Sequence, residues 1–225
     1  MKTRFYDRTA VGQQLAEQLK AYAQRRDVIV LGLPRGGVPV AYEIAQALQV
    51  PLDVCLVRKL GVPHQPELAL GAIASGGVRV LNFELIATLG ITSKTIDVVA
   101  AHELRELQRR DRAYRGDRPQ PQIAGQTVIL VDDGVATGAT MRAAIAVLRS
   151  QQPAAVVVAV PVAPVETYAA LRDEVDRVVC LSTPVPFYSI SLWYDKFPQV
   201  TDAEVQTLLA QSLTPPPSVT PHFSA

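Results

Sequence analysis

The sequence predicts an α/β protein with a central, mostly parallel five-stranded sheet flanked by helices. Short apolar runs of strand length alternate with amphipathic helical segments along most of the chain, which is the pattern of strand–helix–strand units. Some runs are apolar throughout, as in Val28-Ile29-Val30-Leu31, which is typical of strands buried on both faces of a sheet. The 225 residues, 48% apolar and 19% charged, suit one such domain carrying a small appendage.

The elements are predicted from hydrophobic periodicity, beginning with an amphipathic helix at residues 12–26. Strands of the main sheet are predicted at residues 28–31, 52–57, 127–131, 155–160 and 175–181. Further helices are predicted at residues 38–48, 92–114, 139–150, 165–172 and 202–213. Ser75-Gly76-Gly77 separates two short apolar runs, 68–74 and 78–81, and therefore predicts a hairpin between the second strand and the long helix.

Three regions are expected along the chain. Residues 1–181 should form the α/β core, including a hairpin and flexible-loop region at 58–81. Residues 182–213, where the regular alternation stops, should form a small C-terminal hood and helix. Residues 214–225 are rich in proline and should form a mobile tail.

Charge and composition exclude several classes of protein. The net charge of +1 gives no global field that would draw the chain to nucleic acid or to an anionic membrane. The first residues contain no apolar segment of the kind found in signal peptides, so we expect a cytoplasmic protein. Cys55 and Cys180 lie in apolar runs and should be reduced core thiols. An anion-binding role would have to come from a local site.

The most informative stretch is residues 128–140, Val-Ile-Leu-Val-Asp-Asp-Gly-Val-Ala-Thr-Gly-Ala-Thr. A buried strand leads directly into Asp132 and Asp133, the acidic pair, and then into residues 134–140, the small-residue turn. Its backbone N–H groups and the start of the following helix suit an anion such as phosphate. Because carboxylates do not bind phosphate, the acidic pair should contact the hydroxyls of a sugar or a metal held by them. The lysine of a P-loop is absent, and so is the glycine fingerprint of dinucleotide-binding folds.

This stretch resembles the 5-phosphoribosyl 1-pyrophosphate (PRPP) motif of type I phosphoribosyltransferases at all of its positions. The resemblance implies that Asp132 and Asp133 hold the ribose 2- and 3-hydroxyls. It also implies that the 5-phosphate is held by the turn, through Ala136, Thr137, Gly138, Ala139 and Thr140. A receiver-like domain would also place acids at strand ends, but its first strand would end in an acidic pair, whereas this one ends in a basic segment.

Residues 33–37, Leu-Pro-Arg-Gly-Gly, follow the first strand and form what we call the glycine loop. Gly36 and Gly37 permit close backbone approach to a ligand, and Arg35 offers a planar set of donors to phosphate oxygens. In the family this loop binds pyrophosphate and often contains a cis peptide bond, which would be expected at Arg35–Gly36. By the same resemblance Lys59 should reach pyrophosphate.

Other charged residues have competing interpretations. Arg58 is as consistent with a salt bridge as with pyrophosphate binding. His64 lies where family members have a mobile loop, but it equally fits a surface residue. The long helix and the residues just after it carry arginines 105, 109, 110, 112, 115 and 118 among acids, which indicates a solvated face with pairs along the helix. The alternative is that Arg109, Arg110 or Arg115 helps to bind substrate or RNA.

The resemblance implies an enzyme of nucleotide metabolism that displaces pyrophosphate from PRPP with a nitrogenous base or related acceptor. Asp132, Asp133 and Lys59 would be the catalytic residues, and Mg²⁺, held mainly by PRPP and water, would be the cofactor. Phe187, Tyr188 and Trp193 follow the last core strand and could stack a nucleobase-like acceptor. A non-catalytic or regulatory PRPP- or nucleotide-binding protein of the same fold remains the alternative, and a homodimer is left open.

Overall fold

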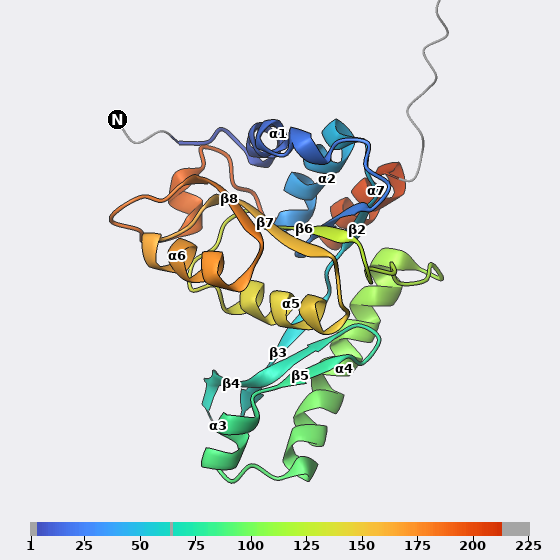
Figure 1. Ribbon diagram of the computed structural model, residues 1–225, viewed down its shortest axis with the longest axis vertical. Helices are drawn as coiled ribbons and strands as arrows, with labels where there is room; N and C mark the ends of the chain where they lie inside the picture. Colours follow the sequence, from blue (N-terminus) through green and yellow to red (C-terminus); the bar gives the residue numbers. More distant parts are fainter. Residues whose placement is uncertain (1–3, 64, 213–225) are drawn as a thin grey trace, which may run out of the picture.

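The computed structural model describes residues 4–63 and 65–212 and contains a five-stranded parallel sheet flanked by helices (Figure 1). Its strands are β1 (Val28–Gly32), β2 (Leu52–Val54), β6 (Thr127–Val131), β7 (Ala155–Val162) and β8 (Arg177–Ser182). They lie in the order β2-β1-β6-β7-β8, and every neighbouring pair is parallel. The predicted fold class is therefore confirmed.

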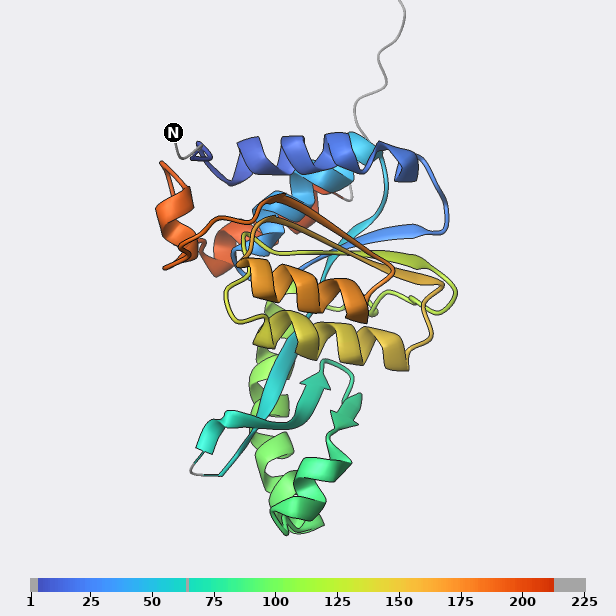
Figure 2. The ribbon, with the colours of Figure 1, turned by 60° about the vertical axis from the view of Figure 1, so that its left-hand side comes forward.

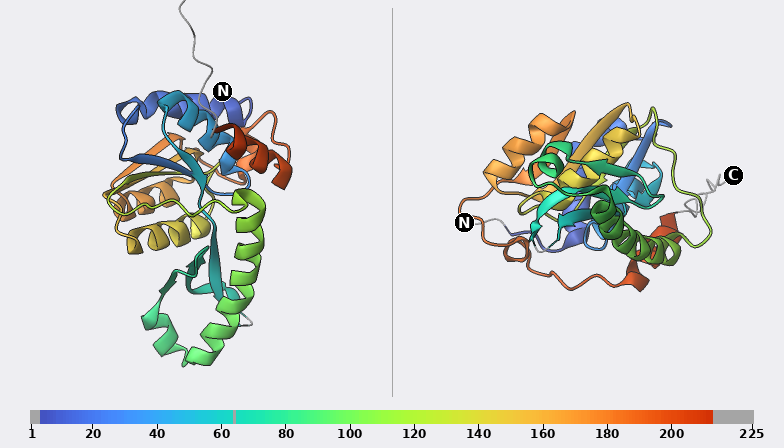
Figure 3. Two further views of the ribbon diagram at one scale, coloured as in Figure 1. Left: turned by 90° about the vertical axis from the view of Figure 1, so that its right-hand side faces the viewer. Right: turned by 90° about the horizontal axis from the view of Figure 1, so that it is seen from below.

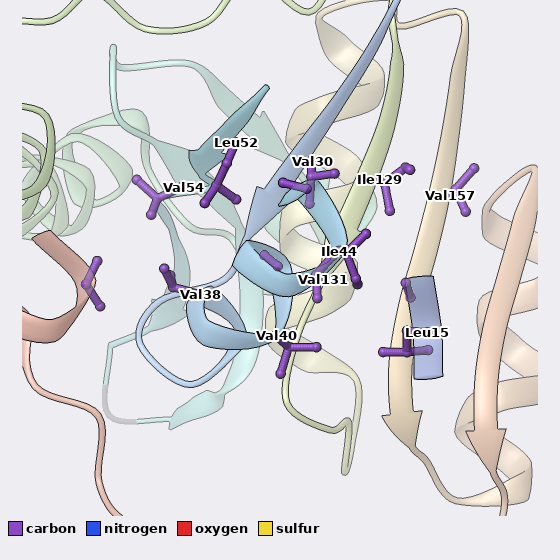
Figure 4. Close-up of a cluster of buried hydrophobic side chains, with 14 of the residues drawn as sticks. Leu15, Val30, Val38, Val40, Ile44, Leu52, Val54, Ile129, Val131 and Val157 are labelled. Carbon is purple, nitrogen blue, oxygen red and sulfur yellow. The ribbon is translucent and has the colours of Figure 1, made fainter. Parts of the chain in front are cut away.

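Helices cover both faces of this sheet. The helices α1 (Arg8–Gln18), α2 (Gly37–Leu48) and α7 (Asp202–Ser212) lie on one side, and α5 (Ala139–Ser150) and α6 (Val165–Glu174) lie on the other (Figures 1 and 2). Alternate strand residues point to opposite faces. Val30 belongs to a core cluster that also contains Leu15 of α1 and Ile44 of α2 (Figure 4), whereas Ile29 belongs to the core under α5. The apolar runs of the strands are unbroken because each face of the sheet is buried in one of these two cores.

A second, antiparallel sheet projects beyond α5, next to a long helix (Figures 1 and 3). It consists of β3 (Val57–Val62), β4 (Gln65–Ala74) and β5 (Arg79–Leu81), and it is followed by α3 (Phe83–Thr88) and α4 (Ser93–Arg115). The predicted hairpin is present as β4 and β5, and the predicted long helix is α4.

The strand predicted at residues 52–57 is wrong beyond Val54. The N–H of Cys55 still donates to the carbonyl of Gly32 at 2.9 Å, but the chain then leaves the main sheet, and β3 begins at Val57 in the small sheet. The apolar run continues across the break because both sheets bury it. Periodicity alone therefore joined two strands that belong to different sheets.

The first helix also differs from its prediction. It begins at Arg8, four residues before the predicted start, because Asp7 caps it by accepting the N–H of Ala10 at 2.9 Å. It ends at Gln18 and is followed by a short 3-10 helix, Lys20–Tyr22. Within the described residues no helix is long and apolar enough to cross a membrane.

The segment after β8 returns to the N-terminus of the chain. It contains a 3-10 helix, Ile190–Trp193, and hydrogen bonds join it to Phe5: the Phe5 N–H donates to Trp193 O, and the Asp195 N–H donates to Phe5 O, both at 2.8 Å. The predicted hood therefore packs along the N-terminal segment before it reaches α7. Leu213 and the predicted tail at 214–225 lie outside the described residues.

Three loops start side by side at the carboxyl edge of the main sheet. Gly32, the last residue of β1, is aligned with Val54 of β2 on one side and with Val131 of β6 on the other. The glycine loop, the start of β3 and the acidic pair therefore emerge next to one another. Open α/β sheets place their ligand sites at this edge.

Candidate functional site

The acidic pair lies at the end of β6, between the glycine loop and the C-terminal segment. Asp133 is 8% exposed and Asp132 is half-buried. The N–H of Asp133 donates to Oδ1 of Asp132 at 2.8 Å. The hydroxyl of Tyr194 donates to the backbone carbonyl of Asp133 at 2.7 Å, which fixes the pair from the C-terminal side.

Arg8 supplies a buried positive charge that the sequence did not reveal. Its Nε and Nη2 lie 2.9 Å and 2.8 Å from Oδ2 of Asp133, and its Nη1 donates to the carbonyl of Pro198 at 2.7 Å. Its guanidinium group also lies 3.9 Å from the ring centroid of Phe197. The hydrogen bond from Arg8 reaches Oδ2 of Asp133 and the one from the Asp133 amide reaches Oδ1 of Asp132, and the two carboxyl groups also contact each other.

The two carboxyl groups influence each other's ionisation. Burial raises the pKa of Asp132 well above its usual value, and repulsion from the carboxylate of Asp133 adds to this shift. Burial also raises the pKa of Asp133, although the neighbouring guanidinium of Arg8 opposes that shift. A ligand that donates hydrogen bonds to the pair would therefore favour its ionised form.

The glycine loop is packed directly against the acidic pair. A Cβ atom on Gly36 would lie 2.0 Å from Oδ2 of Asp133, and one on Gly37 would lie 2.5 Å from the carbonyl oxygen of Val131. Both positions therefore require glycine because the neighbouring loop approaches so closely. The N–H of Gly37 donates to Leu33 O at 3.0 Å within the loop, so this amide, which was predicted to bind PRPP, already has a partner. A cis peptide bond is present in the loop, at Pro34–Arg35 instead of the expected Arg35–Gly36.

The small-residue turn presents its exposed residues beside the start of α5. The exposed members are Ala136, Thr137, Ala139 and Thr140. Gly138 is buried and has φ +77° and ψ 0°, a left-handed conformation that favours glycine. The carbonyls of Ala136 and Thr137 accept hydrogen bonds from the side chains of Thr167 and Arg142, at 2.8 Å and 3.4 Å. With these carbonyls engaged by the protein, the turn and the N-terminus of α5 can offer N–H groups to an anion.

Three basic residues follow the ends of β1 and β2. Arg35 is half-buried, and its Nη1 lies 3.6 Å from Oδ1 of Asp202 in α7. Arg58 points toward α4, where its Nε lies 2.6 Å from Oε2 of Glu103, so it takes the salt-bridge role. Lys59, the next residue along β3, lines a cavity of about 430 Å³ together with Ala139 at the start of α5. The structure therefore brings Lys59 to the side of the small-residue turn.

The aromatic residues predicted to stack an acceptor differ in exposure. Tyr188 is 76% exposed, Phe187 packs partly against the main core, and Trp193 is only 5% exposed. The ring of Trp193 is thus part of the packing between the C-terminal segment and the N-terminus. Of the three, Tyr188 offers its ring to solution.

The remaining candidates from the sequence are His64, the two cysteines and a metal site. His64 lies outside the described residues. Cys55 is buried and Cys180 half-buried, both as free thiols, and burial raises their pKa values to about 12 and about 11. In the described part of the chain no cluster of three or more His, Cys, Asp or Glu side chains could hold a metal ion. The acidic pair could supply two carboxylates at most, so an Mg²⁺ ion here would depend on substrate and water oxygens.

The residues that sequence reasoning missed are Arg8, Tyr194 and Asp202. Each contacts a predicted site residue, but Arg8 is 125 positions away from Asp133 and Tyr194 is 61 positions away. Long-range pairs of this kind leave no periodicity or spacing in the sequence. Arg8 also lies before the helix predicted at residues 12–26, so the prediction gave it no structural role.

Comparison with known proteins agrees with this geometry. The chain is 47% identical over 205 residues to two proteins of Mycobacterium tuberculosis, Rv0571c and MT0597, each named "putative phosphoribosyl transferase". The match covers 91% of this chain and 46% of the relatives, so the chain spans about half of their length.

The crystal structure of TT1426 from Thermus thermophilus is similar over most of the molecule. It is 44% identical, with a TM-score of 0.84, and the match covers 92% of this chain and 98% of that one. The family model for the phosphoribosyl transferase domain matches residues 4–192, which include the glycine loop, the acidic pair and the small-residue turn. The chain therefore belongs to the phosphoribosyl transferase domain family.

Proposed function

We propose that the protein binds PRPP with Mg²⁺ and transfers the phosphoribosyl group to a nitrogenous acceptor, releasing pyrophosphate. The observation that carries this proposal is the juxtaposition of three features at one sheet edge. An acidic pair, with Asp133 buried and Asp132 half-buried, lies between an exposed turn at a helix N-terminus and a loop carrying Arg35. A sugar that bears a phosphate at one end and a pyrophosphate at the other fits this arrangement.

Each part of the site would bind a different part of PRPP. Asp132 and Asp133 would accept hydrogen bonds from the ribose 2- and 3-hydroxyls. The 5-phosphate would bind at residues 136–140, to N–H groups and to the hydroxyls of Thr137 and Thr140. The N–H of Ala139, which donates to Oγ1 of Thr137 at 3.5 Å, would turn to the phosphate. Arg35 and the amide of Gly36 would bind pyrophosphate. Lys59, on the same side as Ala139, would add positive charge near the phosphates.

In the reaction, the bond between C1 of the ribose and a pyrophosphate oxygen breaks, and the electron pair leaves with pyrophosphate. A ring nitrogen of the acceptor forms the new bond to C1. The negative charge that develops on pyrophosphate would be stabilised by Arg35 and Lys59, and the positive charge that develops on the ribose by the carboxylates of Asp132 and Asp133. Mg²⁺ would neutralise part of the phosphate charge. The remaining contribution of the protein is to hold both reactants in line.

The acceptor is proposed to be a nucleobase or a related heterocycle that reaches C1 from the side of the C-terminal segment. Tyr188 is the candidate for stacking it, because its ring is exposed and the segment that carries it is tied to Asp133 through Tyr194. Phe187 would hold the neighbouring Tyr188 in place, because Phe187 is partly packed on the core. The burial of Trp193 makes it a support for this segment and not a stacking partner.

The proposal is tested first by binding and then by turnover. PRPP with Mg²⁺ should raise the melting temperature of the wild-type protein, and Asp132→Asn with Asp133→Asn should abolish the shift while the protein stays folded. Turnover is then measured as pyrophosphate release from radiolabelled PRPP with a panel of purine, pyrimidine and pyridine bases. Binding without release for every base would favour the non-catalytic alternative, and an unchanged shift in the double variant would refute the ribose assignment.

A further inference from the structure

Helix α7 reaches the glycine loop through its first residue. Asp202 lies at the start of α7, where Oδ1 accepts a hydrogen bond from the hydroxyl of Tyr114 in α4 at 2.6 Å and lies 3.6 Å from Nη1 of Arg35. One carboxylate oxygen thus joins a loop, a long helix and the C-terminal helix, which lie together at one corner of the molecule (Figures 1 and 3). The residues matched by the family model end at 192, so α7 lies beyond the family's shared core.

The two contacts of Asp202 differ in strength. At 2.6 Å the bond from Tyr114 is a short hydrogen bond to a charged acceptor, whereas 3.6 Å exceeds hydrogen-bond length and leaves Arg35 held mainly by charge. Tyr114 is 3% exposed, but the side chain of Arg35 is 38% exposed. Asp202 is therefore anchored to α4, while Arg35 is free to turn toward a stronger anion.

The surrounding charges leave Asp202 as the specific partner of Arg35. Arg109 and Arg110 of α4 also act on Asp202, but both are hydrogen-bonded to Glu106 at 2.8 Å. Within the described residues Asp202 is the carboxylate at ion-pair distance from Arg35. The hydrogen bond from Tyr114, followed by the attraction of Arg35, lowers the pKa of Asp202, so this group is ionised at neutral pH.

We propose that Asp202 is an internal competitor of pyrophosphate: it holds Arg35 at the glycine loop and gives it up to the pyrophosphate group of an incoming ligand. This inference rests on the proposed function, which assigns pyrophosphate to Arg35. It makes Asp202 a positioning residue that weakens pyrophosphate binding and thereby favours release of the product. The hydrogen bond from Tyr114 keeps the carboxylate of Asp202 in place while Arg35 moves.

The test measures the binding of magnesium pyrophosphate by calorimetry at low salt. In Asp202→Asn the amide oxygen can still accept the hydrogen bond from Tyr114, so the variant should fold, but the charge beside Arg35 is gone. The dissociation constant should fall by about two- to fivefold, the range expected for a partly exposed ion pair. Asp202→Glu, which restores the charge, should return the constant toward the wild-type value. Raising the salt concentration should shrink the difference between wild type and Asp202→Asn.

Two comparisons separate this competition from a general change of charge. Glu204→Gln removes one exposed negative charge from the same helix and should leave the constant unchanged. In an Arg35→Gln background, Asp202→Asn should have almost no effect, because its target is absent. The proposal is overturned by an unchanged or weaker affinity in Asp202→Asn, by equal tightening in Glu204→Gln, or by a full effect in the Arg35→Gln background. If the wild type bound PRPP and Asp202→Asn bound pyrophosphate as the wild type does, only this inference would fail; if the wild type bound neither ligand, the proposed function would fail with it.

Discussion

Arg8 and Asp133, which are 125 residues apart in the chain, form a buried ion pair with Nη2 of the arginine 2.8 Å from Oδ2 of the aspartate. Their side chains are 10% and 12% exposed. This ion pair links the first helix to the acidic pair, and the same guanidinium group donates a hydrogen bond to the carbonyl of Pro198 in the C-terminal segment. The acidic site thus depends on both ends of the described chain.

Removing the arginine should destabilise the protein strongly. Arg8→Met leaves the carboxylate of Asp133 buried without its cation, and loss of one partner of a buried pair costs about 3–5 kcal/mol. Urea denaturation monitored by circular dichroism should show a decrease of this size in the free energy of unfolding. Arg8→Lys keeps a positive charge but loses the planar group that contacts Asp133 and Pro198 together, so it should fall between Arg8→Met and the wild type.

Arg4 offers a matched control. It pairs with Asp195 at 3.2 Å, but both side chains are about half exposed. Arg4→Met should therefore cost less than about 1 kcal/mol. Similar costs for Arg4→Met and Arg8→Met would mean that the Arg8–Asp133 pair contributes no more than a surface salt bridge.

The part of the site formed by the acidic pair and the small-residue turn could be predicted because its residues are consecutive in the sequence. A strand, the acidic pair, the small-residue turn and a helix follow one another within residues 127–150, so hydrophobic pattern and residue type locate them. The glycine loop was found for the same reason. The reason for its glycines was only partly foreseen, because the surface that Gly36 approaches is the carboxylate of Asp133.

The parts that could not be predicted depend on tertiary contacts. Arg58 and Lys59 are consecutive, and only the structure shows that Arg58 faces Glu103 while Lys59 lines the cavity beside α5. Arg58 and Lys59 point in different directions because side chains alternate along β3. From Arg58 on, this strand was predicted to belong to a hairpin and flexible-loop region because the segment is rich in glycine, proline and charge. The burial of Trp193 depends on backbone pairing with Phe5, at the opposite end of the chain.

The stability of the folded protein should depend on pH because the pKa of the Asp132 carboxyl group is raised. Its pKa is raised in the folded protein, so at neutral pH folding must bury a charge that the unfolded chain exposes to water. This cost disappears as the pH falls from the raised folded pKa toward about 4, the value in the unfolded chain, because the native protein takes up the proton first. Asp132→Asn should thus be more stable than the wild type at pH 7.5, and this advantage should fade toward pH 4.

The same variant should lose the melting-temperature shift produced by PRPP with Mg²⁺, so that stability is gained as function is lost. Thermal unfolding of both proteins between pH 4 and pH 8 measures the difference. Asp173→Asn, an exposed acid on α6, serves as the comparison and should show neither effect. An Asp132→Asn protein that is less stable than the wild type at pH 7.5 would show that hydrogen bonds to the carboxylate outweigh the cost of its burial.

Gly36→Ala should disrupt the site through a single methyl group. The backbone of Gly36 has φ −63°, which alanine tolerates, so the effect should come from contact alone. The added Cβ would stand 2.0 Å from Oδ2 of Asp133 and would push this carboxylate away from Arg8. We expect a loss of about 1–3 kcal/mol in the free energy of unfolding, as for an overpacked core, together with weaker PRPP binding.

A double variant identifies the cause of that loss. In an Asp133→Ala background the carboxylate is absent, so Gly36→Ala should cost clearly less stability than it does in the wild type. Urea denaturation of the four proteins gives the coupling energy. Equal costs in both backgrounds would show that the glycine is required for another reason, such as the conformation of the loop.

Tyr188 and Trp193 should respond in opposite ways to truncation. Trp193 is 5% exposed and packs with the main core, so Trp193→Ala should lower the free energy of unfolding by about 3–5 kcal/mol. Tyr188 is 76% exposed, so Tyr188→Ala should change stability by less than about 0.5 kcal/mol. If the exposed ring stacks the acceptor base, Tyr188→Ala should instead weaken the binding of purine or pyrimidine nucleoside 5′-monophosphates by roughly ten- to a hundredfold, since a stacked base gains about 1–3 kcal/mol.

The fluorescence of Trp193 can then report nucleotide binding at Tyr188. Trp193 is the only tryptophan in the chain, and it lies five residues after Tyr188 in the same segment, so its fluorescence should change when a nucleotide orders that segment. The change should saturate at lower nucleotide concentration in the wild type than in Tyr188→Ala. PRPP binding should be nearly the same in both proteins, because its proposed contacts lie at Asp132, Asp133 and residues 136–140. Equal nucleotide affinity in Tyr188→Ala would move the acceptor away from the C-terminal segment and toward the cavity that Lys59 shares with the start of α5.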